Sequence, residues 1–108
     1  MTDITEVNKT KLSHSLGMAK KAGRIVTGEE LVVKSIQAER ARLVFVAHDA
    51  APNLVKRITD KTTYYEIPML DIFSSAELSH AIGSDRKVIA VQDKGFAKKR
   101  SEERRVGK

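Results

Sequence analysis

Histidine supplies the most versatile chemistry in this 108-residue sequence, because imidazole can serve as a general acid or base and as a metal ligand. The three histidines are His14, His48 and His80, and none forms a metal-binding face with a second histidine or a suitable acid at helical spacing. The sequence contains no cysteine, which excludes zinc fingers, iron–sulfur clusters, thiolate catalysis and disulfides. We therefore expect neither a metal site nor a cofactor.

Two further pairs of residues could carry catalysis. His48 and Asp49 follow an apolar run, and the carboxyl ends of strands host active sites in open α/β sheets; local hydrogen bonding in a loop is the simpler interpretation. Ser74 and Ser75 could be nucleophiles, but Ser74 stands at capping-box spacing from Glu77. The glycine-rich phosphate and dinucleotide motifs and the nucleophile-elbow motif are absent from the sequence. We expect no enzyme activity and no small-molecule substrate.

The composition indicates a globular domain in the cytoplasm. Apolar residues make up 41% of the sequence and charged residues 31%, and a chain of this length corresponds to one domain. No apolar run approaches the ~18 residues needed to cross a bilayer. The first residues include acids and no apolar stretch, unlike a signal peptide. Together with the absence of cysteine, these features favour the cytoplasm and no membrane partner.

The tail over residues 100–108 differs from the rest of the chain. It matches the conceptual translation of a widely used short-read sequencing adapter, and an ordinary basic tail is the alternative interpretation. Four of the 20 basic and two of the 14 acidic residues lie in it, so residues 1–99 have 16 basic and 12 acidic residues and a net charge of +4 instead of +6. A modestly basic domain suggests a polyanionic partner without identifying it.

Apolar spacing and capping signals predict the first two helices. Residues 1–8 are expected to form a flexible N-terminus, and an apolar stripe over about residues 9–22 predicts a helix that ends at Gly23. Thr27 and Glu30 have the spacing of a capping box, which predicts the start of a second helix. That helix is expected to run to about Glu39 and to bury three apolar residues: Leu31, Val32 and Ile36.

Strands and helices alternate in the rest of the sequence. The run from Leu43 to Ala47 is apolar at every position, which is typical of a strand covered on both faces. Pro52 opens a third helix, and Ser74 caps a fourth helix that ends at Gly83. Three other extended segments complete the pattern: Arg24–Val26, Ile67–Ile72 and Val88–Val91. The alternation predicts an α/β domain over residues 9–99, with a small, mainly parallel four-stranded sheet and helices on both faces.

Four segments, in the same order, resemble one known family. They are Leu16–Gly23, Val26–Lys34, Leu43–Ala50 and Ala76–Gly83. Together they resemble the ribosomal protein L7Ae/L30e superfamily, whose members bind kink-turn RNA, and the likeness is strongest to small bacterial members of the YlxQ type. The resemblance spans about residues 9–99. It implies a three-layer α/β/α sandwich and a structured RNA partner, ribosomal or otherwise non-coding.

The resemblance also implies an RNA site in two parts, the start of the second helix and the loop before the last helix. Seven residues match these parts: Gly28, Glu29, Glu30 and Lys34 in the first, and Ile72, Phe73 and Ser74 in the second. Kink-turn binders typically read Gly-Thr-Asn-Glu-x-x-Lys in the first part. Here the Asn-Glu pair is replaced by Glu30-Leu31, and Ser79 stands where glycine is common in the last helix.

The acidic residues of the first part favour contact with bases over contact with phosphates. Glu29 and Glu30 would occupy the positive end of the helix and repel a phosphate there. Because a carboxylate accepts hydrogen bonds and donates none, its natural partners are base amino and imino groups. Lys34 could donate to guanine O6 or N7. The alternative is structural, with Glu30 as a cap and Lys34 as its surface ion-pair partner.

Two further expectations leave alternatives open. Phe73 lies between a strand and a helix cap, where it could stack on an unpaired base or pack against Leu78 as a hydrophobic staple. Lys20, Lys21 and Arg24 are expected near the same rim and could contact phosphates; a solvated helix end is the alternative. We expect a non-catalytic, monomeric RNA-binding protein, the alternative being a protein-interaction or regulatory module with weak or no RNA binding.

Overall fold

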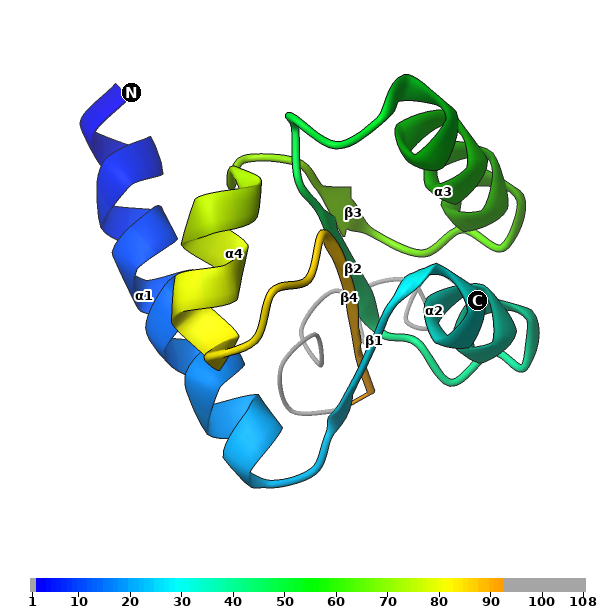
Figure 1. The fold of residues 1–108 in the computed structure, drawn as a ribbon, viewed down its shortest axis with the longest axis horizontal. Coiled ribbons are helices and arrows are strands. Elements are labelled where there is room, and N and C mark those ends of the chain that lie inside the picture. Colours follow the sequence, from blue (N-terminus) through cyan, green and yellow to red (C-terminus); the bar gives the residue numbers. More distant parts are fainter. Residues whose placement is uncertain (1, 93–108) are drawn as a thin grey trace, which may run out of the picture.

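A computed structural model describes residues 2–92, in which four helices alternate with four strands (Figure 1). In chain order the elements are α1 (Thr2–Lys21), β1 (Ile25–Thr27), α2 (Glu29–Gln37), β2 (Leu43–Val46), α3 (Pro52–Tyr64), β3 (Met69–Leu70), α4 (Ser75–Ile82) and β4 (Val88–Val91). The order expected from the sequence is confirmed. The tail at residues 100–108 lies outside the described residues.

The sheet is mixed, so the expectation of a mainly parallel sheet is wrong. Its strand order is β1-β4-β2-β3, in which β4 is antiparallel to both β1 and β2 and only β2 and β3 are parallel. Gly83 ends α4 in the left-handed conformation, with φ of 74°. The chain then doubles back along α4, where the Arg86 amide donates to the Ser79 hydroxyl at 3.3 Å. β4 therefore starts at the same edge of the sheet as α4, and it runs antiparallel to β2.

Helices cover both faces of the sheet, which gives three layers (Figure 1). Phe45 and Ile89 point to one face and pack with residues of α1 and α4 such as Leu16. On the other face, Val44 and Val46 pack with α2 and α3. Successive residues of β2 thus face opposite layers, as the pleat requires. All four residues of this strand are buried, which confirms that both faces of the strand are covered.

The ends of the helices agree with the sequence at some positions and differ at others. The capping box of Ser74 and Glu77 is present, and Gly23 has the left-handed φ of 70° expected at a helix end. The first helix starts at Thr2, before the expected start near residue 9, because an established helix gains one hydrogen bond for each residue added and can extend beyond its apolar stripe. None of the helices described for residues 2–92 is long and apolar enough to span a bilayer.

The capping box expected for the second helix is wrong. The N-cap of α2 is Gly28, with φ of 91° and no side-chain cap. Thr27 is instead the last residue of β1, and its hydroxyl accepts a hydrogen bond of 3.0 Å from Arg86 Nε. Leu31 is 54% exposed, so its expected burial is also wrong. The buried face of α2 consists of Val32, Val33, Ser35 and Ile36.

Candidate functional site

The two parts of the expected site lie at the same edge of the sheet, which we call the carboxyl edge because β1, β2 and β3 end there. Gly28, after β1, donates its amide to the Val88 carbonyl at 3.2 Å. The Ala47 amide, after β2, donates to the Lys87 carbonyl at 2.8 Å, and the His48 amide donates to the Phe73 carbonyl at 2.9 Å. These bonds connect the start of α2 with the loop before α4. Three strand spacings, roughly 14 Å, separate β1 from β3.

The start of α2 is open above Gly28. A Cβ atom at this glycine would meet no atom within 4 Å, although the positive φ strains any other residue. Glu29 is held by the neighbouring helix, since Arg57 of α3 donates to its Oε2 at 2.7 Å across 28 residues of sequence. Glu30 is exposed and makes no such pair within residues 2–92. Only one of the two acidic residues is therefore left to contact a partner.

Glu30, Leu31 and Lys34 lie on one exposed face of α2, because residues three and four positions apart are neighbours on a helix. No ion pair joins Glu30 to Lys34 in the described part of the chain, so their surface pairing is not seen. This face offers a carboxylate acceptor, an ammonium donor and an apolar side chain between them. Such a set can contact the edge and the sugar of a nucleotide.

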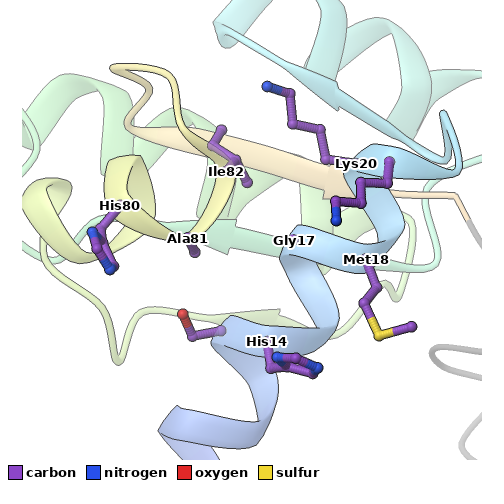
Figure 2. A pocket seen from close by; sticks show the side chains of 9 residues that line it. His14, Gly17, Met18, Lys20, His80, Ala81 and Ile82 are labelled. Carbon is purple, nitrogen blue, oxygen red and sulfur yellow. The ribbon is translucent and has the colours of Figure 1, made fainter.

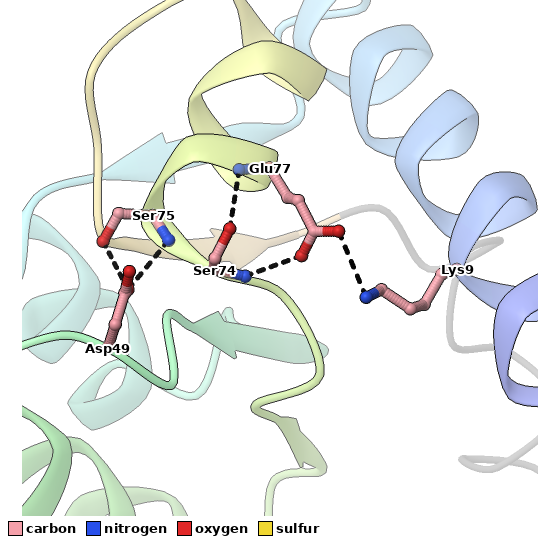
Figure 3. A network of polar contacts seen from close by, with 5 residues as sticks. All are labelled: Lys9, Asp49, Ser74, Ser75 and Glu77. Carbon is pink, nitrogen blue, oxygen red and sulfur yellow. Dashed lines mark hydrogen bonds and ion pairs between the residues drawn. The ribbon is translucent and has the colours of Figure 1, made fainter.

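A polar network fixes the loop before α4 (Figure 3). The Ser74 amide donates to Glu77 Oε1 at 2.8 Å, and the Glu77 amide donates to Ser74 Oγ at 3.1 Å. Lys9 of α1 lies 3.1 Å from Glu77 Oε2. Asp49, after β2, accepts from both the amide and the hydroxyl of Ser75, at 2.9 and 2.7 Å. The two serine hydroxyls thus serve the start of α4, and Asp49 has a structural role, although its hydrogen bonds connect two loops 26 residues apart and are not local in the sequence.

These contacts favour the charged form of both carboxylates. The hydroxyl of Ser75, and then its amide, lowers the pKa of Asp49 below its ordinary value. The Ser74 amide, followed by Lys9, lowers the pKa of Glu77. A carboxylate whose pKa is lower in the folded than in the unfolded protein stabilises the fold above its unfolded pKa. That stabilisation is lost as the pH falls through the folded pKa.

Acid should therefore weaken the fold partly through Glu77. We expect the free energy of unfolding to fall as the pH is lowered below about 4, and we expect Glu77→Gln to flatten this dependence. Glutamine suits the same capping-box position but does not titrate there. The measurement is urea denaturation of both proteins between pH 3 and pH 7. Superimposable pH profiles would contradict the assigned role of Glu77.

Phe73 is buried and offers no face to a base. It is 3% exposed, its ring centroid lies 5.7 Å from that of Phe45, and it belongs to the same apolar cluster as Leu78. Its position immediately before the Ser74 cap, with Leu78 four residues into the helix, is that of a hydrophobic staple. The burial contradicts the base-stacking interpretation and favours the staple. Ile72 is only partly buried against this cluster.

The cations expected near the same rim lie at the opposite edge of the sheet. Lys20 and Lys21 end α1, and Arg24 precedes β1. The Arg24 carbonyl accepts from the Gln92 amide at 2.8 Å, beyond the last residue of β4. The expectation that these three cations share the rim of Gly28 is wrong, because β1 separates them from it along its whole length.

Sequence reasoning missed three basic residues at or near the carboxyl edge. Arg57 holds Glu29, while Arg86 binds Thr27 and Lys87 lies next to the start of β4. The basic pair before the last strand was visible in the sequence as Asp85-Arg86-Lys87. Its relevance depends on the central position of β4, which the order of elements did not reveal. No group of three potential metal ligands occurs among the described residues.

Comparisons with known proteins agree with this architecture. The sequence profile described as the ribosomal protein L7Ae/L30e/S12e/Gadd45 family matches residues 10–101. The RNA-binding protein YlxQ of Enterococcus faecium is 46% identical over 99 residues, which cover 92% of this chain and 96% of the relative. YlxQ of Bacillus subtilis, also described as RNA-binding, is 46% identical over 85 residues, or 78% and 85% of the two chains.

Two solved structures show similar folds. A protein of unknown function from Bacillus halodurans superposes with a TM-score of 0.76 and 39% identity over 81% of this chain and 89% of its own. The Giardia lamblia 15.5kD RNA binding protein superposes with a TM-score of 0.73 and 19% identity, over 83% of this chain and 78% of its own. At that lower identity the likeness concerns the fold alone.

Proposed function

Because the chain belongs to the ribosomal protein L7Ae/L30e/S12e/Gadd45 family, we propose that it is a non-catalytic RNA-binding protein that recognises a kink-turn-like structured RNA as a monomer. The names of the two relatives at 46% identity support RNA as the partner. The cytoplasm is the proposed location. Recognition uses the shape of the RNA and a few base edges, as is usual for structured RNA.

The observation that carries this proposal is the joining of the two parts of the site at the carboxyl edge. The Gly28–Val88 and His48–Phe73 hydrogen bonds belong to one continuous path along that edge. The open glycine allows a base or sugar to approach the start of α2 closely. Glu30 accepts from a base, Lys34 donates to one, and the loop at Ile72–Ser74 contacts the RNA through its backbone and the edge of Ile72.

A titration against two RNAs tests the proposed function. We expect the full chain to bind a kink-turn duplex at least about tenfold more tightly than a straight duplex of equal length, a difference of ~1.4 kcal/mol. Both affinities are measured by fluorescence anisotropy at the same salt concentration. Equal affinity for the two duplexes would remove the kink from the proposal, and failure to bind either RNA would remove RNA binding altogether.

The salt dependence of the same titration reports how the RNA is held. Residues 1–99 have a net charge of only +4, and two acids lie at the start of α2. Each phosphate contact contributes a slope of about −0.7 to −0.9 in log affinity against log salt. We expect a total slope shallower than about −6. A steeper slope would mean that backbone contacts dominate and that the base-edge account is wrong.

One observation favours a second candidate function, a protein-interaction module. Leu31 is 54% exposed beside Glu30 and stands where kink-turn binders typically have glutamate, so this face of α2 offers an apolar side chain in place of a hydrogen-bond acceptor. A chain that bound neither RNA in the titration above would favour this alternative.

A further inference from the structure

The helices α1 and α4 form one outer layer of the fold, and a groove runs between them on the side away from the sheet. Two adjoining hollows of ≈ 430 and ≈ 530 Å³ share Ser13, His14 and His80 in their linings, so they form one groove. Figure 2 shows His14 on α1 and His80 on α4, on opposite sides of the part where the helices meet. We call this feature the α1–α4 groove.

Small residues form the floor of the α1–α4 groove. A Cβ atom at Gly17 would lie 3.1 Å from the Ala81 carbonyl oxygen, so the two helices are in close contact there. Because the floor is made of glycine, alanine and serine, an extended chain could lie between the taller side chains on either side. The floor explains the shape of the groove but not what fills it.

The charges along the groove identify the chemistry of its occupant. Lys20 and Lys21 line one end, and the imidazoles of His14 and His80 lie where the two hollows join. At the other end Lys9 neutralises Glu77, the acidic residue of the lining, at 3.1 Å. The lysines bind phosphate as point charges, and an imidazole N–H donates a hydrogen bond to a phosphate oxygen. The lining is thus complementary to a chain of phosphates.

The groove begins where the proposed RNA site ends. Its Lys9 end is also lined by Phe73, which belongs to the loop before α4 at the carboxyl edge. Its other end reaches Lys20 and Lys21 at the opposite edge. Along α1 the distance from Lys9 to Lys21 is about 18 Å at the helical rise of ~1.5 Å per residue. That length accommodates several phosphates of one strand.

We propose that a single RNA strand leaving the carboxyl-edge site runs along the α1–α4 groove toward Lys20 and Lys21. The inference rests on the proposed RNA binding and adds a second contact surface to it. It gives the two lysines a role as phosphate contacts even though they lie far from Gly28. The strand is recognised by its backbone, so this surface selects for an unpaired extension and not for a sequence.

The test compares two RNAs and two variants of the full chain. The probes are a blunt kink-turn duplex and the same duplex with ten-uridine extensions at its ends. The groove variant is Lys20→Gln with Lys21→Gln. The control variant, Lys11→Gln with Lys56→Gln, removes the same charge from two exposed lysines outside the groove lining.

We expect the unaltered protein to bind the extended RNA about tenfold more tightly than the blunt one. The extension should steepen the salt slope by about 1.4, the share of two phosphate contacts at ~0.7 each. The groove variant should lose both effects and the control variant should keep them. Variants that lose them equally would overturn the proposal, because the effect would then be one of net charge.

Two further outcomes decide whether RNA occupies the groove and whether the proposed function holds. A groove variant that binds the extended RNA as the unaltered protein does would overturn the RNA occupant and leave an acidic protein segment as the alternative. Failure of the proposed function appears separately, as loss of preference for the blunt kink-turn over a straight duplex. If the kink-turn preference is absent but the extension still strengthens binding through Lys20 and Lys21, RNA binding in the groove is retained and only the kink-turn specificity is lost.

Discussion

Phe73→Ala is expected to lower the free energy of unfolding by about 3–5 kcal/mol, the usual cost of removing a buried aromatic side chain. Phe73 is 3% exposed and belongs to one apolar cluster with Phe45 and Leu78. Its ring centroid lies 5.7 Å from that of Phe45 and 5.8 Å from Lys9 Nζ. Removing the ring leaves a cavity between β2 and α4. The measurement is urea denaturation with an unchanged slope against denaturant concentration.

Two other variants separate packing from RNA contact. Tyr64→Ala removes an aromatic ring that is 78% exposed, and we expect a change within about 0.5 kcal/mol. Phe73→Leu keeps much of the buried volume, so it should cost less than about 1.5 kcal/mol and leave RNA affinity unchanged. A clear loss of RNA affinity in Phe73→Leu, with the fold intact, would show that the ring touches RNA despite its burial.

The elements that the sequence predicted correctly are those with a local cause. Leu43–Val46 forms a strand because every side chain there is apolar and both faces are covered. The Ser74–Glu77 box starts α4 through two hydrogen bonds that involve only four consecutive residues. The left-handed turns at Gly23 and Gly83 depend on a backbone conformation that glycine adopts readily. Each of these signals is complete within a few residues.

The direction of β4 could not be predicted in this way. Alternating helices and strands specify layers, but the last strand can enter the sheet from either edge. The hydrogen bond between the Arg86 amide and the Ser79 hydroxyl belongs to a return along α4 that no residue spacing reveals. The same return carries Arg86 and Lys87 to the carboxyl edge, so the error in the sheet and two of the three missed cations have one cause.

The candidate site was predicted in outline but not in its individual side chains. Leu31, Val32 and Val33 are consecutive and apolar, and sequence alone could not show which of them faces solvent. The structure buries Val32 and Val33. Thr27 could cap a helix or end a strand, and its position opposite Ile89 of β4 decides for the strand. Burial of Phe73 likewise depends on Phe45, which is distant in the sequence.

The exposure of Leu31 makes the double change Glu30→Asn with Leu31→Glu the most informative alteration of the site. It restores the Asn-Glu pair that kink-turn binders typically have at these two positions. We expect affinity for a standard kink-turn duplex to rise by about 10- to 100-fold, since a well-placed pair of base-edge contacts is worth ~1–3 kcal/mol. Asparagine can donate and accept at a base edge, whereas Glu30 only accepts.

The fold should tolerate this change. Leu31 is 54% exposed, so the new carboxylate is not buried, and it lies in the first turn of α2, where an acidic residue is favourable. We expect the free energy of unfolding to change by less than about 0.5 kcal/mol. The net charge is unchanged, because one carboxylate is removed and one is added. An affinity gain therefore cannot come from weaker repulsion of the RNA backbone.

Three proteins and two RNAs complete the experiment. Glu30→Asn alone raises the net charge by one. If this variant binds the kink-turn and straight duplexes more tightly by the same factor, the gain comes from electrostatic attraction alone. The double variant should gain on the kink-turn duplex only. If it gains nothing there while the unaltered protein already binds the kink-turn selectively, Glu30 and Leu31 are an alternative means of reading the same RNA. If neither protein binds, the acidic and apolar face of α2 belongs to a protein interface, and the family fold has been retained without its RNA partner.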